Sequence, residues 1–480
     1  MTPERLGQPK ERPFVGRTNE LDLVCKSFER PSDFPERVIG FYAPLGTGVS
    51  TLLEEIKRQD YARLSKLGGY DELRVITVSV SMADFMTGGQ FDEASFTANL
   101  ALQLSSGEEQ TETEQVYSST ASPLSVVTQS ALGQIAEGKK LLFVMDHLDE
   151  TVKAREPWKR IEKEFIAEFM DEKAAKDNVL FILGSRTPRI NFPTFNVRRF
   201  TTLSPLDNLS FDEMADGLQL DCGTVFDRSH GHPLTLVRML TALEEQGVGL
   251  NDFDAVYAAL QEGLELRVLQ QFFQDVVHTL PDDSRPFLSP TSVLRWINVG
   301  PLKSALEANS LTQKGKRDNF YLDIIGEMQG AGIAYWDNKK AAYVIAPQIR
   351  PLLERYFELS SPQACYNAHQ TAFDYHRQHL KDYPQYVHHC LPEAAYHAGR
   401  MTQINNRWSL EHKEEVAEVM NTDYWNGLIG SLKGQREDWK SMAEVLAGDT
   451  ELKDQRSLVH AITGLDLLSI LEEATKSRLE

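Results

Sequence analysis

The stretch Ala43-Pro44-Leu45-Gly46-Thr47-Gly48-Val49-Ser50-Thr51 follows an apolar run predicted as a strand and opens a run with helical periodicity. It is similar to the phosphate-binding pattern G-x-x-x-x-G-K-[ST], in which backbone N–H groups and a helix N-terminus surround phosphate oxygens. Ala43 replaces the first glycine, and Val49 replaces the lysine. We expect Gly46 and Gly48 to form a phosphate cradle that lacks the cation for fast phosphoryl transfer. A glycine-rich turn with a purely structural role is the alternative.

Hydroxyl and carboxylate groups are placed to bind a metal ion beside this cradle. Ser50 and Thr51 supply hydroxyls, and a fully apolar run over 141–145 leads into Asp146-His147-Leu148-Asp149-Glu150. We expect Ser50 and Asp146 to hold Mg²⁺, and Asp149 or Glu150 to orient an attacking water. Alternatively, these acids only cap the helix that follows. The metal interpretation requires the loop and Asp146 to converge on one pocket beside adjacent parallel strands.

The composition excludes several classes of protein. Of 480 residues, 41% are hydrophobic and 25% are charged, and no apolar run reaches membrane-spanning length. Residues 1–13 have no apolar signal-peptide segment, so we expect a cytoplasmic protein with no membrane partner. The formal charge of −20 opposes binding to nucleic-acid phosphates, so we do not expect a nucleic-acid partner. Four scattered cysteines without a C-x-x-C pair predict buried thiols.

Hydrophobic patterns predict a first domain over residues 1–204 that resembles a P-loop NTPase domain. Short apolar runs alternate with helical stretches there, which predicts an α/β fold with a parallel sheet flanked by helices. The predicted strands are 38–43, 73–81, 141–145, 179–183 and 197–203. A polar, acidic stretch between 104 and 123 is expected to be an exposed, mobile insertion.

The remaining residues are predicted to be mainly helical. We expect a helical lid over 205–264, a winged-helix domain over 265–360, and an α-helical sensor or partner-binding region over 361–480. The winged-helix prediction rests on apolar runs at 333–336 and 342–345, which flank a polar turn and are predicted to form a hairpin.

In this order, the motifs resemble the STAND branch of P-loop NTPases, which includes NACHT and NB-ARC proteins. Residues 13–21 look like the opening hhGRxxEL segment, which packs near the adenine. Residues 181–186 resemble a sensor strand that ends in Ser-Arg, and residues 231–234 are similar to a G-x-P motif whose proline covers the base. The resemblance covers roughly residues 12 to 360.

The resemblance implies roles for single residues. Gly16, Arg17 and Pro233 would contact the nucleotide, and Arg186 would contact the γ-phosphate, because a guanidinium suits an anionic oxygen cluster. Surface ion pairs are the alternative for both arginines, and a plain turn before a helix is the alternative for Pro233. We expect His232 to be an exposed turn histidine.

The family implies a molecular switch with ATP or ADP and Mg²⁺ as cofactors, a protein effector or sensor partner, and homo-oligomerisation as one outcome of activation. Val49, and Ala346 where NB-ARC proteins carry a phosphate-binding histidine, weaken such coupling. We therefore expect a switch in signalling or defence that binds nucleotide weakly, with slow or absent hydrolysis. The alternative is an adaptor or inhibitor scaffold that no longer binds nucleotide. A winged-helix DNA-binding regulator ranks last because of the acidic charge.

The helical tail contains several metal-ligating residue types. His388, His389, Cys390 and His397 lie close together in the sequence. The step from His389 to His397 is not the i, i+4 spacing of two ligands on one helix face, and Pro392 interrupts it. We expect packing or an aromatic-rich contact surface here rather than a metal site, and we interpret the region as a partner-binding arm.

Overall fold

The computed structural model describes residues 14–421, with gaps at 30, 59–74, 88–89, 106–122, 150–154, 172, 189–191, 193, 200, 219–222, 313–314 and 339, and also residues 424–425, 428, 446 and 452. The chain divides into two compact units, Met1–Glu265 and Leu266–Glu480. No helix in the described part is long and apolar enough to cross a membrane. Most of the predicted insertion, Glu150 and Cys222 fall outside the described residues.

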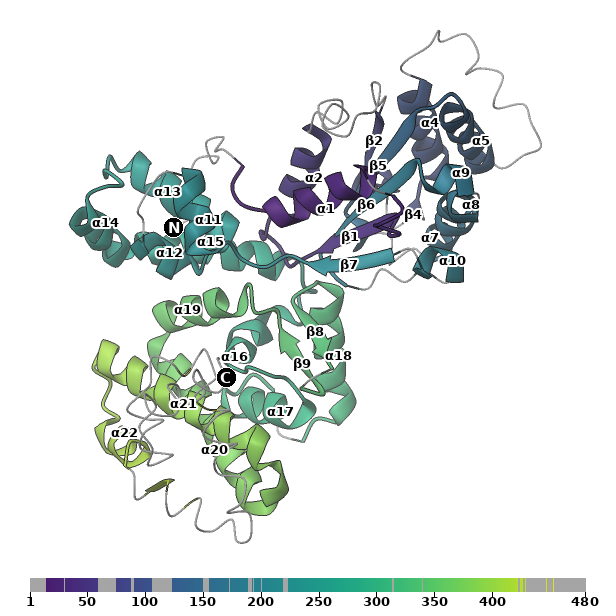
Figure 1. Cartoon of the computed structure of the whole chain (residues 1–480). Helices are drawn as coiled ribbons and strands as arrows, with labels where there is room; N and C mark the ends of the chain where they lie inside the picture. Colours follow the sequence, from purple (N-terminus) through teal and green to yellow (C-terminus); the bar gives the residue numbers. More distant parts are fainter. Residues whose placement is uncertain are drawn as a thin grey trace, which may run out of the picture. The chain divides into compact units, whose positions relative to one another are not determined.

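Five parallel strands form the centre of the first unit (Figure 1). Their order across the sheet is β2-β5-β6-β1-β7. The predicted parallel sheet is therefore confirmed, but β1 and β5 are not adjacent, because β6 pairs with both of them. The strands are β1 (Val38–Tyr42), β2 (Val75–Ser81), β5 (Lys140–Asp146), β6 (Val179–Ser185) and β7 (Thr201–Pro205).

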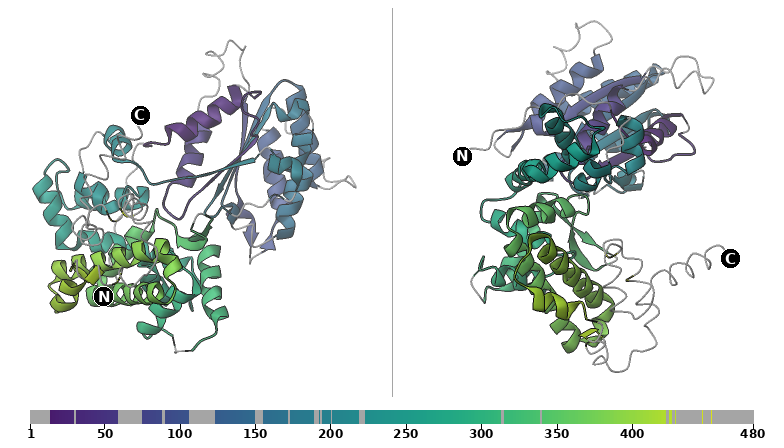
Figure 2. Two further views of the ribbon diagram at one scale, coloured as in Figure 1. Left: turned by 60° about the horizontal axis from the view of Figure 1, so that its bottom comes forward. Right: turned by 90° about the vertical axis from the view of Figure 1, so that its left-hand side faces the viewer.

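Helices cover both faces of this sheet, which explains why β6 is buried along its whole length. On one face, α1 (Thr18–Glu29) and α2 (Val49–Arg58) pack against β1, β5 and β6. Figure 2 shows this pair, in purple, across the sheet from the blue helices. The opposite face is covered by α4 (Glu93–Ser105), α5 (Pro123–Ala136), α7 (Arg155–Ile161), the π-helical turn η3 (Glu162–Ile166), α8 (Ala167–Asp171) and α9 (Lys173–Lys176).

One predicted strand begins later than expected. The first half of 197–203 belongs to α10 (Phe195–Arg199), and β7 begins only at Thr201. Val197 is fully buried in the core on the α5 side of the sheet. A short apolar run cannot distinguish a buried helix face from a strand, which is why the prediction was wrong here.

A helical segment follows β7 and completes the first unit. It contains α13 (Pro233–Glu245), which lies within the region expected to be helical. Its neighbours are α11 (Phe211–Leu218), α12 (Gly223–Ser229), α14 (Phe253–Ala259) and the π-helical turn η4 (Leu260–Leu264), before α15 (Glu265–His278).

The described part of the second unit is helical apart from one hairpin. Strands β8 (Ala334–Asp337) and β9 (Ala342–Ile345) pair antiparallel, as predicted, and Tyr343 also bridges to Ile297. Two long helices, α20 (Pro362–Asp382) and α21 (Val387–Trp408), pack against each other. The other elements are the 3-10 turns η5 (Arg285–Phe287) and η6 (Pro384–Tyr386), α16 (Leu288–Ser292), α17 (Val299–Ala308), α18 (Asp318–Gly330), α19 (Arg350–Ser360) and α22 (Lys413–Val419).

Candidate functional site

A cavity of about 830 Å³ opens in the first unit where β1, β5 and β6 end. Its lining brings together the glycine loop, the acids after β5, the end of β6 and the start of α13. Of the residues predicted for one site, nine line this cavity, Gly16 does not appear in its lining, and Glu150 lies outside the described residues. The nine are Arg17, Gly46, Gly48, Ser50, Thr51, Asp146, Asp149, Arg186 and Pro233.

The loop between β1 and α2 exposes backbone N–H groups at the cavity. Gly46 and Gly48 have φ values of +83° and +101°, which glycine adopts without strain. Within the described part of the chain, the backbone N–H groups of Val49, Ser50 and Thr51 donate no hydrogen bond. These are the first N–H groups of α2, where the helix dipole is also positive. The loop therefore has the chemistry of an anion site.

His232 fastens this loop to the start of α13, contrary to the predicted exposed turn. Its side chain is fully buried, Nε2 lies 3.1 Å from the carbonyl oxygen of Leu45, and Nδ1 lies 2.9 Å from the Thr235 hydroxyl. The backbone N–H of Leu234 also donates to the carbonyl of Gly46 at 3.1 Å. Burial lowers the pKa of His232 to about 4, so the ring is neutral at pH 7. Histidine here is a structural tether of the loop.

Arg17 braces the loop from the opposite direction. Its Nη2 donates to the carbonyl oxygens of Thr47 at 2.9 Å and Asp207 at 2.6 Å, and the side chain is buried. Burial lowers the pKa of Arg17, and the nearby carboxylate of Glu20 partly offsets this. Arg17 is therefore not the surface ion pair of the alternative interpretation. Its contacts join the loop to the segment after β7.

Asp146 reaches the same cavity although β6 separates its strand from β1. A Cβ atom on Gly184 of β6 would lie 2.5 Å from Oδ1 of Asp146 and 3.1 Å from Cγ1 of Val49. The missing side chain at Gly184 therefore lets Asp146 lie across β6 toward the start of α2. Oδ1 of Asp146 also accepts a hydrogen bond from the backbone N–H of His147 at 2.7 Å, at a turn where His147 has φ +56°.

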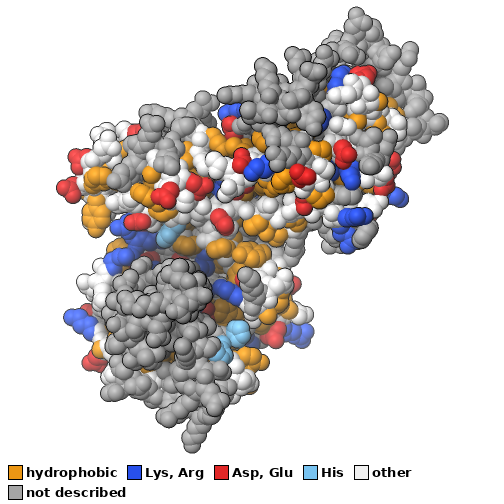
Figure 3. All heavy atoms as spheres, in the orientation of Figure 1, with side chains coloured by type: hydrophobic (Ala, Val, Ile, Leu, Met, Phe, Trp, Pro, Cys, Tyr) orange, Lys and Arg blue, Asp and Glu red, His pale blue; other side chains and the backbone are white. Residues whose placement is uncertain are grey.

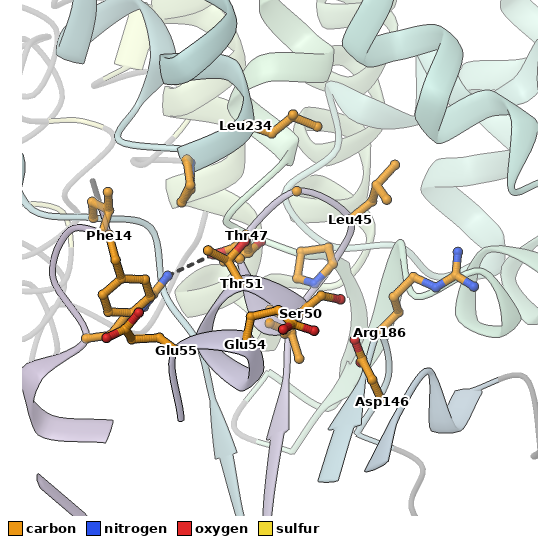
Figure 4. Close-up of a pocket in the computed structure, with 18 of the residues that line it drawn as sticks. Phe14, Leu45, Thr47, Ser50, Thr51, Glu54, Glu55, Asp146, Arg186 and Leu234 are labelled. Atoms are coloured by element: carbon orange, nitrogen blue, oxygen red, sulfur yellow. Dashed lines mark hydrogen bonds between the residues drawn. The ribbon is translucent and has the colours of Figure 1, made fainter. Parts of the chain in front are cut away.

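Asp149 and Arg186 form a half-buried pair at the cavity. The backbone N–H of Arg186 donates to Oδ1 of Asp149 at 3.0 Å, and its Nε donates to Oδ2 at 2.7 Å. Both carboxylate oxygens therefore hold the arginine, which favours a positioning role for Asp149 over the predicted orientation of water. Figure 4 shows Asp146 and Arg186 on one side of the loop and Phe14 and Glu55 on the other.

The charges around the cavity do not replace the missing lysine. Four acids, Glu54, Glu55, Asp146 and Asp149, and three arginines, Arg17, Arg58 and Arg186, line it, which leaves one negative charge in excess. The lysine position itself carries the aliphatic Val49. The carboxylate of Asp146 and the hydroxyl of Ser50 are hard oxygen donors, which fit Mg²⁺. Anion binding would therefore depend on backbone amides and a bound cation.

Three contributions to the site were missed in the sequence. His232 was misassigned, and the acids Glu54 and Glu55 on α2 and the close approach at Gly184 were not considered. The i, i+4 spacing from Ser50 to Glu54 places both on one face of α2, and this signal could have revealed the acid. No local signal identifies His232, because its partner lies 187 residues away.

A parallel sheet with helices on both faces and a glycine loop between β1 and α2 is the architecture of P-loop ATPases. No protein-family model and no curated protein matches the sequence.

Among solved structures, the chain is similar to the ORC2 protein of Aeropyrum pernix with ADPNP and ADP, at 13% identity and a TM-score of 0.44, over 75% of this chain and 98% of that one. A Walker-type ATPase of Pyrococcus abyssi has 13% identity and a TM-score of 0.43, over 72% and 98% of the two chains. A STAND protein with a tetratricopeptide repeat sensor from Pyrococcus horikoshii has 14% identity and a TM-score of 0.31, over 99% and 67%. Similarity at this level does not assign a function, so a function has to be argued from the geometry of the cavity.

Proposed function

We propose that the first unit binds ADP or ATP together with Mg²⁺, with its phosphates on the amides at the start of α2. The observation that carries the proposal is that these unengaged amides, Asp146 and Ser50 line one cavity. Its volume of about 830 Å³ lies within the usual range for small-molecule sites. Pro233, Phe14 and Val15 supply apolar surface at the same cavity for a base.

Hydrolysis in this proposal is slow or absent. The position of the phosphate-binding lysine carries Val49, so no side-chain cation there offsets the charge that develops on the transferred phosphoryl group. Asp149 holds Arg186 with both oxygens, so a water at this carboxylate would compete with an existing pair. The site is therefore suited to occupancy more than to turnover.

A bound nucleotide can act as a switch because the loop is joined to the helical segment after β7. His232 contacts the carbonyl of Leu45, and Leu234 contacts that of Gly46. A shift of the loop would therefore move the start of α13. We infer a STAND-type regulator of NACHT or NB-ARC kind that acts through a protein partner. The hairpin β8–β9, the bridge from Ile297 to Tyr343 and the surrounding helices support a winged-helix domain in the second unit.

Titration calorimetry with Mg·ADP and Mg·ATP on the full chain tests nucleotide binding. We expect one site per chain with micromolar affinity, a marked loss in Asp146→Ala, and phosphate release at background rate. An absence of heat with both nucleotides, together with no nucleotide released from the purified protein, would remove the proposal. Asp171→Ala, which changes an acid on α8 outside the cavity lining, is the matched control.

The second candidate is an adaptor or inhibitor scaffold that has lost nucleotide binding. The excess negative charge in the cavity and Val49 favour it. For a scaffold, Asp146→Ala leaves binding to a captured protein partner unchanged, whereas for a switch the same change alters it at constant stability. DNA binding has little support, because Lys and Arg side chains are scattered among acidic and apolar ones over the described part of the face in Figure 3.

A further inference from the structure

A buried group of metal-ligating side chains lies between α20 and α21 in the second unit. It contains His376 from α20, and Glu393 and His397 from α21, with one donor atom from each within 4.8 Å of the others. All three side chains are buried. Glu393 and His397 are four residues apart, which places them on one helix face. The partners of His397 in this group are therefore His376 and Glu393, and not His388 or His389, which precede it on the same helix.

Nearby contacts favour one of the two ring nitrogens of His397 as the site of its proton. Oε1 of Glu354 lies 3.4 Å from Nε2 of His369 without forming a hydrogen bond, and this negative charge favours a proton on that nitrogen. With that proton in place, Nδ1 of His369 would accept from Nδ1 of His397, which lies 3.0 Å away. Nε2 of His397 is left with a lone pair. It is buried and has no hydrogen-bond partner among the residues that the structure describes.

His376 presents a second buried nitrogen without a partner. In the described part of the chain, nothing forms a hydrogen bond with its Nδ1, and its ring stacks on that of His397 with centroids 5.8 Å apart. Burial lowers the pKa of His376 to about 3 and that of His397 well below its ordinary value.

Arg295 holds the side chain of the third group, Glu393, in a fixed orientation. Its Nε lies 3.0 Å from Oε1 and 3.2 Å from Oε2, and its Nη2 lies 2.8 Å from Oε1. Hydrogen-bonded partners of this kind commonly orient ligating carboxylates. The positive charge of Arg295 offsets the negative charge of the Glu393 carboxylate. A bound dication would therefore favour an anion or a polarised water as a further ligand.

We propose that His376, Glu393 and His397 bind a divalent transition-metal ion of the zinc class. Two neutral imidazoles and one carboxylate form a ligand set used for zinc with a fourth position open, and imidazole favours such ions over Mg²⁺. Glu393 and Arg295 also line a cavity of about 1110 Å³ in the second unit. The ion cross-links α20 and α21.

Cobalt substitution tests the site directly. Full-length protein is freed of metal with EDTA and titrated with Co²⁺ while the visible absorption is recorded, and Zn²⁺ is then added in competition. We expect one Co²⁺ per chain, a visible band typical of low coordination number, and displacement by Zn²⁺. No band together with no retained Zn²⁺ by elemental analysis of the wild-type protein would overturn the proposal, whatever the variants do.

Variants separate this site from other histidines and from the cavity in the first unit. His397→Gln and Glu393→Gln should weaken Co²⁺ binding by about tenfold or more, while His389→Gln, which changes an exposed histidine on the same helix, should leave it unchanged. Zn²⁺ should raise the Tm of the wild-type protein and of His389→Gln but not that of the site variants. Equal Co²⁺ affinity in all variants, or loss in His389→Gln alone, would contradict the assignment.

Discussion

The two units bury histidines in opposite ways. His232 in the first unit uses both ring nitrogens, one on the carbonyl of Leu45 and one at Thr235. His376 and His397 in the second unit each keep a buried nitrogen that no other described residue bonds. Because an unpaired buried polar group is costly, the first pattern indicates structure and the second indicates a ligand. The same amino acid therefore has different functions according to how its nitrogens are satisfied.

Removing His232 is the strongest way to break this contrast. His232→Ala deletes the tether to Leu45, removes the side chain that accepts from the Thr235 N–H at the start of α13, and leaves a cavity. We expect a loss of about 4 kcal/mol in the free energy of unfolding, measured by urea denaturation. His230→Asn, at an exposed histidine two residues away, should change it little. A wild-type value in His232→Ala would show that the tether is dispensable.

The pH dependence of stability sharpens the same contrast. The folded pKa of His232 is about 4, below the unfolded value of about 6.5, because burial and the charge of Arg238 oppose protonation. As pH falls from 6.5 to 4, the unfolded chain takes up a proton that the folded chain does not, so about 3 kcal/mol of stability is lost. Above pH 6.5 this contribution is constant.

Urea denaturation of the wild-type protein and of His232→Gln across this pH range separates the contribution of His232 to the free energy of unfolding from the contributions of other histidines. The difference in free energy of unfolding between the two proteins should narrow as pH falls from 6.5 to 4. Parallel curves would show that His232 does not resist protonation.

A substitution at Gly184 tests whether the side chains around the glycine loop are closely packed there, as they are around His232. Gly184→Ala places Cβ against Oδ1 of Asp146 and, at 2.6 Å, against Cδ1 of Leu53. We therefore expect a loss of about 2 kcal/mol in the free energy of unfolding, together with weaker Mg·ADP binding. Gly133→Ala, where a Cβ meets nothing within 4 Å, should be neutral or slightly stabilising. Thermal unfolding of the two variants compares them, and equal Tm values would contradict the close approach.

Position 49 gives the smallest expected effect. Val49→Lys adds a cation beside the amides of α2, where a phosphate would accept its hydrogen bond, so Mg·ADP affinity should rise by about fivefold, or ~1 kcal/mol. Val49→Met supplies similar length without charge and serves as the control. Equal affinities in calorimetry would place the phosphates elsewhere.

Local patterns predicted much of the fold and nine of the residues that line the cavity. The loop, the buried run before Asp146 and the strand before Arg186 each carry their signal within a few residues. Their convergence was predicted correctly although the strands were wrongly expected to be adjacent. The reason is Gly184, whose missing side chain lets Asp146 lie across β6.

The rest depends on contacts between distant segments. The burial of His232 requires a carbonyl 187 positions earlier, and the pairing of Asp149 with Arg186 joins the ends of two strands. His376 lies on α20, whereas Glu393 and His397 lie on α21, so their approach depends on how these two helices pack and has no signal in either helix alone. Sequence spacing within one element cannot show such pairings.

The most direct test of the central claim compares ADP with adenosine, because the two share a base and differ in phosphates. If the amides at the start of α2 bind phosphate, Mg·ADP should bind the full chain about tenfold or more tightly than adenosine, a difference of at least ~1.4 kcal/mol in calorimetry. Equal affinity of the two ligands, or binding of neither, would contradict the account.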